Sequence, residues 1–141
     1  MVVFWGQGYE GASLTDLTSA MGITNTSMYA AFSNKEELLC EALERYAEGP
    51  AAYAAMALEQ PTALPVATPF LAGSVGACTR PARPAGCLGV QGSPDAGRTV
   101  RDALAAWRDE GRARLLDRFR RAVREGDLPG MSIRGCSPGT A

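Results

Sequence analysis

Apolar residues recur every three to four positions through much of this chain, which is the spacing of one face of an α-helix. Leu14, Leu17 and Met21 share such a face, and Met28 and Phe32 share another. A third and longer stripe is formed by Leu38, Leu39, Ala42, Leu43 and Tyr46. No segment has the apolar–polar alternation of a half-buried strand. The pattern therefore predicts an all-α fold.

Capping signals divide the first part of the chain into short helices. Ser13, with Asp16 three positions later, is typical of a helix N-terminus, and Gly22 offers the left-handed conformation that ends a helix. Thr24 can cap the following helix, which is expected to extend from about residue 25 to 32. Two short helices joined by a tight turn form the helix-turn-helix arrangement.

The neighbouring segments complete this unit. Residues 1–9 are typical of the end of an apolar helix that stops at the glycines Gly6 and Gly8. Residues 33–36, Ser-Asn-Lys-Glu, predict a capping box that opens a third helix, and Gly49-Pro50 is expected to end that helix.

The second half of the chain is less regular. Residues 51–59 are rich in alanine and predict a helix. Prolines between residues 60 and 84, among them Pro65 and Pro69, predict interruptions, because a proline inside a helix costs about 3 kcal/mol. A helical piece is expected between them, over 70–78. Residues 86–92, GCLGVQG, predict a short helix packed closely against its neighbours.

A long helix over about 98–125 is the clearest element of the chain. Its apolar stripe consists of Val100, Leu104, Trp107, Leu115, Phe119 and Val123. Gly126 and Pro129 are expected to end it. Residues 130–141 lack any periodicity and predict a disordered tail.

The helix predicted over 25–32 has side chains that suit a DNA groove. Asn25, Thr26, Ser27 and Tyr29 are expected to point outward, opposite Met28. Asparagine can pair with adenine through two hydrogen bonds, while serine and threonine hydroxyls suit phosphates or base edges. Lys35, in the first turn of the next helix, adds an ammonium to free backbone amides and so predicts a phosphate clamp.

The charge distribution does not favour this hypothesis. The formal net charge is −1, and residues 1–48 hold two basic residues against seven acidic ones, whereas a DNA-binding surface is normally basic. Residues 98–127 hold nine arginines against six acids, several of them four residues apart, such as Asp117 and Arg121; these predict a solvated helix face. A helical interaction module without DNA binding therefore stays open as the alternative.

Composition excludes several classes of site. The chain has no histidine, and its cysteines, Cys40, Cys78, Cys87 and Cys136, form no CxxC pair, so a zinc site or a histidine-based catalytic triad is not expected. We expect no enzyme, no catalytic residues and no cofactor. The chain has no apolar run of membrane-spanning length and no secretory signal, which predicts a cytoplasmic protein without membrane contact.

Residues 8–43, GYEGASLTDLTSAMGITNTSMYAAFSNKEELLCEAL, resemble the DNA-binding segment of TetR-type (tetracycline repressor family) transcriptional regulators. Residues 86–92 and 125–129 resemble later pieces of one subgroup of that family. The ordered set of motifs is specific, whereas any one of them alone is weak.

The resemblance implies particular roles. Thr24, Asn25, Thr26 and Ser27 match the start of the recognition helix, Tyr29 an aromatic that meets the DNA backbone, and Lys35 a phosphate-binding lysine. Ser13 and Thr15 match positions that approach phosphate. The family acts as a homodimer on a near-palindromic double-stranded operator, from which a small-molecule effector bound in the second domain releases it. Candidate residues for that ligand pocket are Phe70, Cys87 and Trp107, with burial in the core as the alternative.

The chain departs from the family pattern at both ends. A basic arm and a longer first helix normally precede the position of Val2, and two further helices, which form much of the dimer interface, normally follow Pro129. We therefore expect a form truncated at both ends, and a homodimer where the C-terminal helices are present. The expected organisation is a DNA-binding domain over 1–47, a partial helical regulatory domain over 48–129 and the tail over 130–141. The predicted function is a DNA-binding transcriptional regulator, a repressor released by its ligand.

Overall fold

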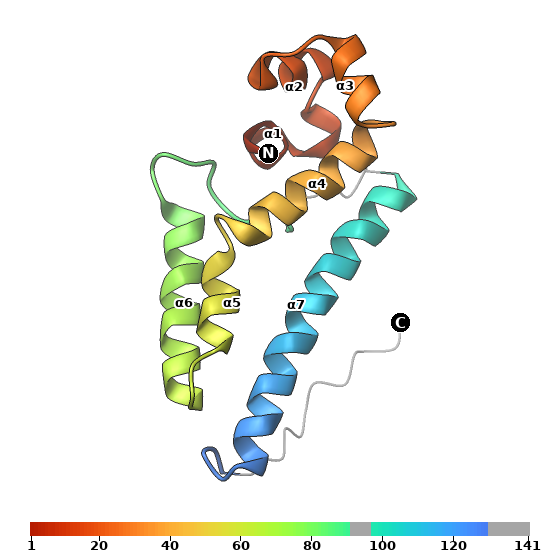
Figure 1. Ribbon diagram of the computed structural model, residues 1–141. Helices are drawn as coiled ribbons and strands as arrows, with labels where there is room; N and C mark the ends of the chain where they lie inside the picture. Colours follow the sequence, from red (N-terminus) through yellow and green to blue (C-terminus); the bar gives the residue numbers. More distant parts are fainter. Residues whose placement is uncertain (91–96, 130–141) are drawn as a thin grey trace, which may run out of the picture.

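The computed structural model describes residues 1–90 and 97–129, which form seven α-helices and no strand, as the apolar pattern predicts. These are α1 (Val2–Gly11), α2 (Leu14–Met21), α3 (Asn25–Ala31), α4 (Lys35–Glu48), α5 (Ala52–Leu58), α6 (Ala63–Thr79) and α7 (Arg98–Arg124). Helices α1, α2 and α3 gather at one end of the molecule, and α4 leads from them to the hairpin of α5 and α6 (Figure 1). Helix α7 runs beside α4, α5 and α6.

One apolar core joins the two ends of this arrangement. The buried stripe of α4 (Leu38, Leu39, Ala42, Leu43 and Tyr46) matches the prediction in full. Trp5 of α1 meets Tyr46 edge-on with ring centres 5.0 Å apart, and Tyr46 lies 5.9 Å from the ring of Trp107 in α7. The same cluster of buried residues includes Val100 and Leu104 of α7. Helix α4 is thus packed on α1 and on α7 at once.

The interruptions predicted at Pro65 and Pro69 do not occur, whereas the prolines at 61, 81 and 84 lie outside any helix as expected. Helix α6 runs unbroken from Ala63 to Thr79 with Pro69 inside it. Pro65 lies in the first turn, where a backbone N–H has no partner within the helix, so its ring costs little there. Packing against α5 offsets the cost of Pro69, because the rings of Phe70 and Tyr53 lie 5.8 Å apart. Tertiary contacts therefore override the local signal of this segment.

Three other elements differ from the sequence pattern. Helix α1 continues past Gly6 to Gly11, with a kink at Gly8 (φ 72°, ψ 177°), a conformation open to glycine because it has no Cβ. The N-cap of α4 is Asn34 rather than the predicted Ser33, and its side chain accepts from the amide of Glu37. Residues 86–90 form a turn instead of a short helix, with Gly86 at φ 83°. Residues 91–92, like the predicted tail over 130–141, lie outside the described residues.

Near the C-terminal end of α7, the buried residues differ from the predicted stripe. Val100 and Leu104 are buried as predicted, but Val123 is 41% exposed while its neighbours Arg118 and Ala122 are buried. From Trp107 to Val123 the predicted stripe advances in multiples of four residues, which is more than one 3.6-residue turn each time, so it winds away from the core along this 27-residue helix. Arg118 is 5% exposed, and its Nη2 donates a hydrogen bond to the carbonyl oxygen of Gln60 at 2.8 Å.

Candidate nucleic-acid interface

Helix α2 is capped as its sequence predicts. The amide of Asp16 donates to Ser13 Oγ at 3.1 Å, and the Asp16 carboxylate accepts from both the amide and the hydroxyl of Ser13. At its other end Gly22 adopts the left-handed conformation (φ 68°), and the amide of Ile23 returns to the carbonyl of Thr18 at 3.0 Å. This closure fixes the angle at which the chain enters α3.

Helix α3 presents a polar outer face. Thr24 Oγ1 accepts from the amide of Ser27 at 3.1 Å and lies 3.0 Å from its hydroxyl, so these two side chains hold the helix start in place. On the inner side Met28 is completely buried. The predicted outward residues are all exposed, and Tyr29 keeps half of its surface accessible. Within the described parts of the chain, Asn25 and Thr26 have no side-chain hydrogen-bond partner, which leaves their polar atoms available to a ligand.

The start of α4 lies next to this surface. The amide of Glu37 donates to the side chain of Asn34 at 2.8 Å, and the Glu37 carboxylate accepts from the amide of Ser33 at 2.6 Å. That hydrogen bond holds the pKa of the Glu37 carboxyl below its usual range. Lys35, the first residue of the helix, places its ammonium nitrogen 4.4 Å from the centre of the Tyr9 ring.

The predicted DNA-binding residues therefore come together at one end of the molecule. Ser13 and Thr15 lie at the start of α2, Thr24 to Tyr29 lie in α3 or directly before it, and Lys35 opens α4 (Figure 1). The hydroxyl of Ser13 is 2.6 Å from the Asp16 carboxylate, which places a negative charge beside that candidate phosphate contact. Thr15 is also exposed, but within the described residues its side chain is not hydrogen-bonded to a carboxylate.

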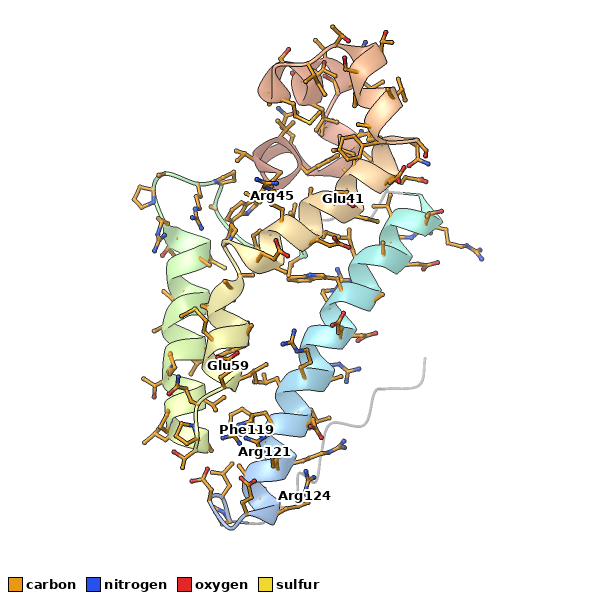
Figure 2. All side chains as sticks on the ribbon, viewed as in Figure 1. Glu41, Arg45, Glu59, Phe119, Arg121 and Arg124 are labelled. Carbon is orange, nitrogen blue, oxygen red and sulfur yellow. The ribbon has the colours of Figure 1, made fainter. Side chains whose placement is uncertain are left out.

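The charged side chains near this surface belong to helices other than α3. Helix α3 has no charged residue. Glu41, Glu44 and Glu48, with Arg45, line a groove of about 630 Å³ between α1, α2 and α4. Arg121 and Arg124 lie at the end of α7 that is remote from α2 and α3 (Figure 2). Arg121 pairs there with Glu125 at 3.6 Å, and not with Asp117, the partner that its spacing predicts.

A second groove of about 410 Å³ lies between α4, α5 and α7. Phe70, Cys87 and Trp107, the three candidate pocket residues, all line it. Trp107 packs on the backbone of Gly89, where a Cβ atom would overlap the indole. The predicted close packing of the segment that begins at Gly86 is therefore confirmed, although that segment is not a helix. Burial, and then a hydrogen bond with Cys87, raise the pKa of Tyr46 beside it.

The sequence did not indicate other residues of this groove. Tyr53 and Arg114 also line it, and both belong to segments that were predicted to be helical. Helical periodicity shows which residues share a face but not which helix that face meets. Arg108 lines the groove as well and is held by a hydrogen bond from its Nη1 to the carbonyl of Gly89 at 2.6 Å.

Comparison with known proteins decides the family. Residues 1–42 match the family model described as bacterial regulatory proteins, tetR family. The chain is 39% identical to a cysteine mutant of the TetR family transcriptional regulator CifR, solved with double-strand operator DNA; the two superpose with a TM-score of 0.84, over 94% of this chain and 71% of that one. The chain belongs to the TetR family.

Other TetR-family relatives agree with this assignment. The chain is 40% identical to a putative TetR regulator from Rhodococcus sp. RHA1, with a TM-score of 0.54 over 92% of this chain and 71% of that one. It is 35% identical over 103 residues to the transcriptional repressor ComR of Escherichia coli, which is 69% of this chain and 49% of ComR. It is 42% identical over 59 residues to the regulator YezE of Bacillus subtilis, 42% of this chain and 30% of YezE. The chain thus spans half or less of the curated relatives it matches.

Within the described residues of this TetR-family chain, no three histidine, cysteine or acidic side chains are grouped so that they could hold a metal ion. None of the described helices is long and apolar enough to cross a membrane.

Proposed function

We propose that this protein is a sequence-specific DNA-binding transcription regulator, a repressor that a small-molecule ligand releases from its operator. The observation that carries the proposal is the exposed polar face of α3, seated by the left-handed Gly22 and flanked by Lys35. The solved complex of CifR with operator DNA and the repressor ComR support it.

The candidate surface divides into base-reading and phosphate-binding residues. Asn25 and Thr26 have free polar atoms on a slim helix, which suits hydrogen bonds to base edges in the major groove. Tyr29, Lys35 and Thr15 are assigned to the phosphate backbone, which positions a protein on DNA without reading its sequence. Thr24, Ser27 and Ser13 hold helix starts in place, and we assign them to phosphate contacts through their remaining hydrogen-bonding capacity.

Helix α4 connects the candidate ligand groove with the candidate DNA-binding surface. Its first residue is Lys35, while Glu44 and Ala47 in its second half line the groove of about 410 Å³. A ligand between Phe70, Cys87 and Trp107 would act on α4 directly, and a shift of one rigid helix can carry an effect between two sites. We assign 1–47 to DNA binding and 48–129 to regulation, although one core joins them.

We also propose that the protein binds its operator as a homodimer and is located in the cytoplasm. In a homodimer on a near-palindromic operator, each of the two α3 helices would bind one half-site of the DNA. The protein would act in the cytoplasm, without enzymatic activity and without a cofactor.

Fluorescence anisotropy with labelled duplexes tests this function. Lys35→Ala should weaken binding to any duplex and lower the slope of log affinity against log salt by about 1. The control is Arg112→Ala, which removes a cation from an exposed ion pair on α7 and should leave the slope unchanged. Asn25→Ala should instead alter base preference once an operator has been selected from a random pool. An unchanged salt slope in the Lys35 variant contradicts the phosphate assignment.

The alternative is a helical interaction module without DNA binding. The seven acidic residues among positions 1–48 favour it, since they oppose the approach of phosphate. Non-specific DNA binding has a Kd of about 10⁻⁴–10⁻⁶ M at physiological salt. Absence of binding at low salt, even at tens of micromolar protein, would contradict the regulator and favour the alternative.

A further inference from the structure

The ammonium of Lys35 lies over an aromatic ring rather than beside a carboxylate. Its nitrogen is 4.4 Å from the ring centre of Tyr9, well within the range of a cation–π interaction. Glu36 is the next residue and Glu10 adjoins Tyr9; both carboxylates are near enough to contribute to raising the Tyr9 pKa, after burial. Within the described residues, Lys35 nevertheless forms no ion pair.

This difference matters for binding a phosphate. An ammonium paired with a carboxylate must lose that partner before it can bind another anion, and both charges must then be rehydrated or paired anew. A ring attracts the ammonium through one side only and takes none of its three N–H donors in a hydrogen bond to a carboxylate. Lys35 therefore keeps its donors for an incoming phosphate while its flexible side chain is restrained.

The ring is itself held in place. Tyr9 stacks on Phe4 with ring centres 6.1 Å apart and planes within 10° of parallel, and Phe4 is buried in the core. The kink at Gly8 turns the chain directly before Tyr9. The ring is thus held by a buried residue of the core while Lys35 lies over it.

We infer that Tyr9 is a positioning residue for DNA binding, which holds the Lys35 ammonium ready for a backbone phosphate and away from Glu10 and Glu36. This inference rests on the proposed function and adds to it a residue that does not belong to α2, α3 or α4. Tyr9 acts through Lys35, so its effect requires that lysine.

A double-mutant cycle on the full chain tests this dependence. The variants are Tyr9→Leu, Tyr9→Phe, Lys35→Ala and Tyr9→Leu with Lys35→Ala, each titrated against a labelled random-sequence duplex over a range of salt concentrations. Tyr9→Leu should weaken binding about two- to five-fold, while Tyr9→Phe, which keeps the ring, should bind like the parent. In the Lys35→Ala background, Tyr9→Leu should have no further effect. Equal losses in both backgrounds would overturn the inference and reduce Tyr9 to a structural role.

A second measurement does not depend on DNA. Lys35 is the only lysine of the chain, so reductive methylation with ¹³C-formaldehyde labels it and the N-terminal amine alone. In the free protein, ring current from Tyr9 should move the dimethyl-Lys35 resonance upfield of its position in urea, and Tyr9→Phe should keep that shift. A resonance at the unfolded position in the parent protein would overturn the inference, even if Tyr9→Leu failed to fold. Absence of DNA binding with the upfield shift present would instead contradict the proposed function.

Discussion

The indole nitrogen of Trp5 donates a hydrogen bond to the carbonyl oxygen of Gly86, 3.1 Å away and 81 residues later in the chain. The bond joins α1, in the candidate DNA-binding unit, to the turn at Gly86. The next residue of that turn, Cys87, lines the groove of about 410 Å³. The same indole packs edge-to-face with the ring of Tyr46, whose hydroxyl is hydrogen-bonded to Cys87. Contacts between side chains in the core therefore connect α1 with the turn beside the groove.

Replacing this indole should destabilise the whole chain. Trp5→Phe removes the donor to Gly86 and leaves a cavity at a site with no exposed surface, which together cost about 1–4 kcal/mol of unfolding free energy. Urea denaturation followed by far-UV circular dichroism measures the loss. Val2→Ala, at a position that is 58% exposed on the same helix, is the control and should change little. Equal stability of Trp5→Phe and its parent would show that the bond does not join the two parts.

A side chain at Gly22, in the turn between α2 and α3, should destabilise the fold moderately. An added Cβ would meet no atom within 4 Å, so the whole cost of Gly22→Ala comes from the left-handed backbone (φ 68°) and is about 1–2 kcal/mol. Gly111→Ala is the matched control: it also lies in open space but within α7, where alanine stabilises a helix by about 1 kcal/mol. The two identical substitutions should thus shift the urea midpoint in opposite directions.

Replacing Arg118 by an apolar residue should not reduce the stability of the fold. Its Nη2 donates to the carbonyl of Gln60, but its Nε and Nη1 atoms are buried without a hydrogen-bond partner within the described residues, so the burial of this charge is only partly compensated. Arg118→Met keeps the aliphatic stem and removes that charge, and we expect equal or higher stability, by about 1–2 kcal/mol. Arg120→Met, on the exposed side of α7, should be neutral. A clear loss of stability at position 118 would contradict this expectation and mean that the bond to Gln60 outweighs the cost of burying the two unpaired nitrogens.

The start of α4 should lose stability in acid. Because the amide of Ser33 lowers the pKa of Glu37 in the folded state, that carboxylate stabilises the fold above the unfolded pKa near 4.5, and its contribution is lost as the pH falls through the lower, folded value. Glu37→Gln should therefore be less stable than its parent at neutral pH, and the difference should shrink in acid. Glu41→Gln, which removes a carboxylate without a hydrogen bond in the described residues, is the control. A difference that does not change with pH would contradict the assigned bond.

Local sequence determined the helix-turn-helix unit because its signals act within a few residues. Ser13, Gly22 and Thr24 cap or end helices through bonds to amides and carbonyls three to five positions away, and the structure has each in its predicted role. The buried stripe of α4 follows from its period alone. The exposed face of α3 follows in turn, because Met28 fixes which side is inward.

Tertiary structure decided what depends on contact between distant segments. Helix α6 persists through Pro69 because Tyr53 packs against it, the turn at 86–90 is held by Trp5 and Trp107, and the inner face of α7 changes along its length. Tyr9 meets Lys35 only because a kink at Gly8 and the stack on Phe4 bring its ring there. Periodicity and capping depend on interactions within one segment. Which other segment each helix face contacts depends instead on the packing of the whole chain.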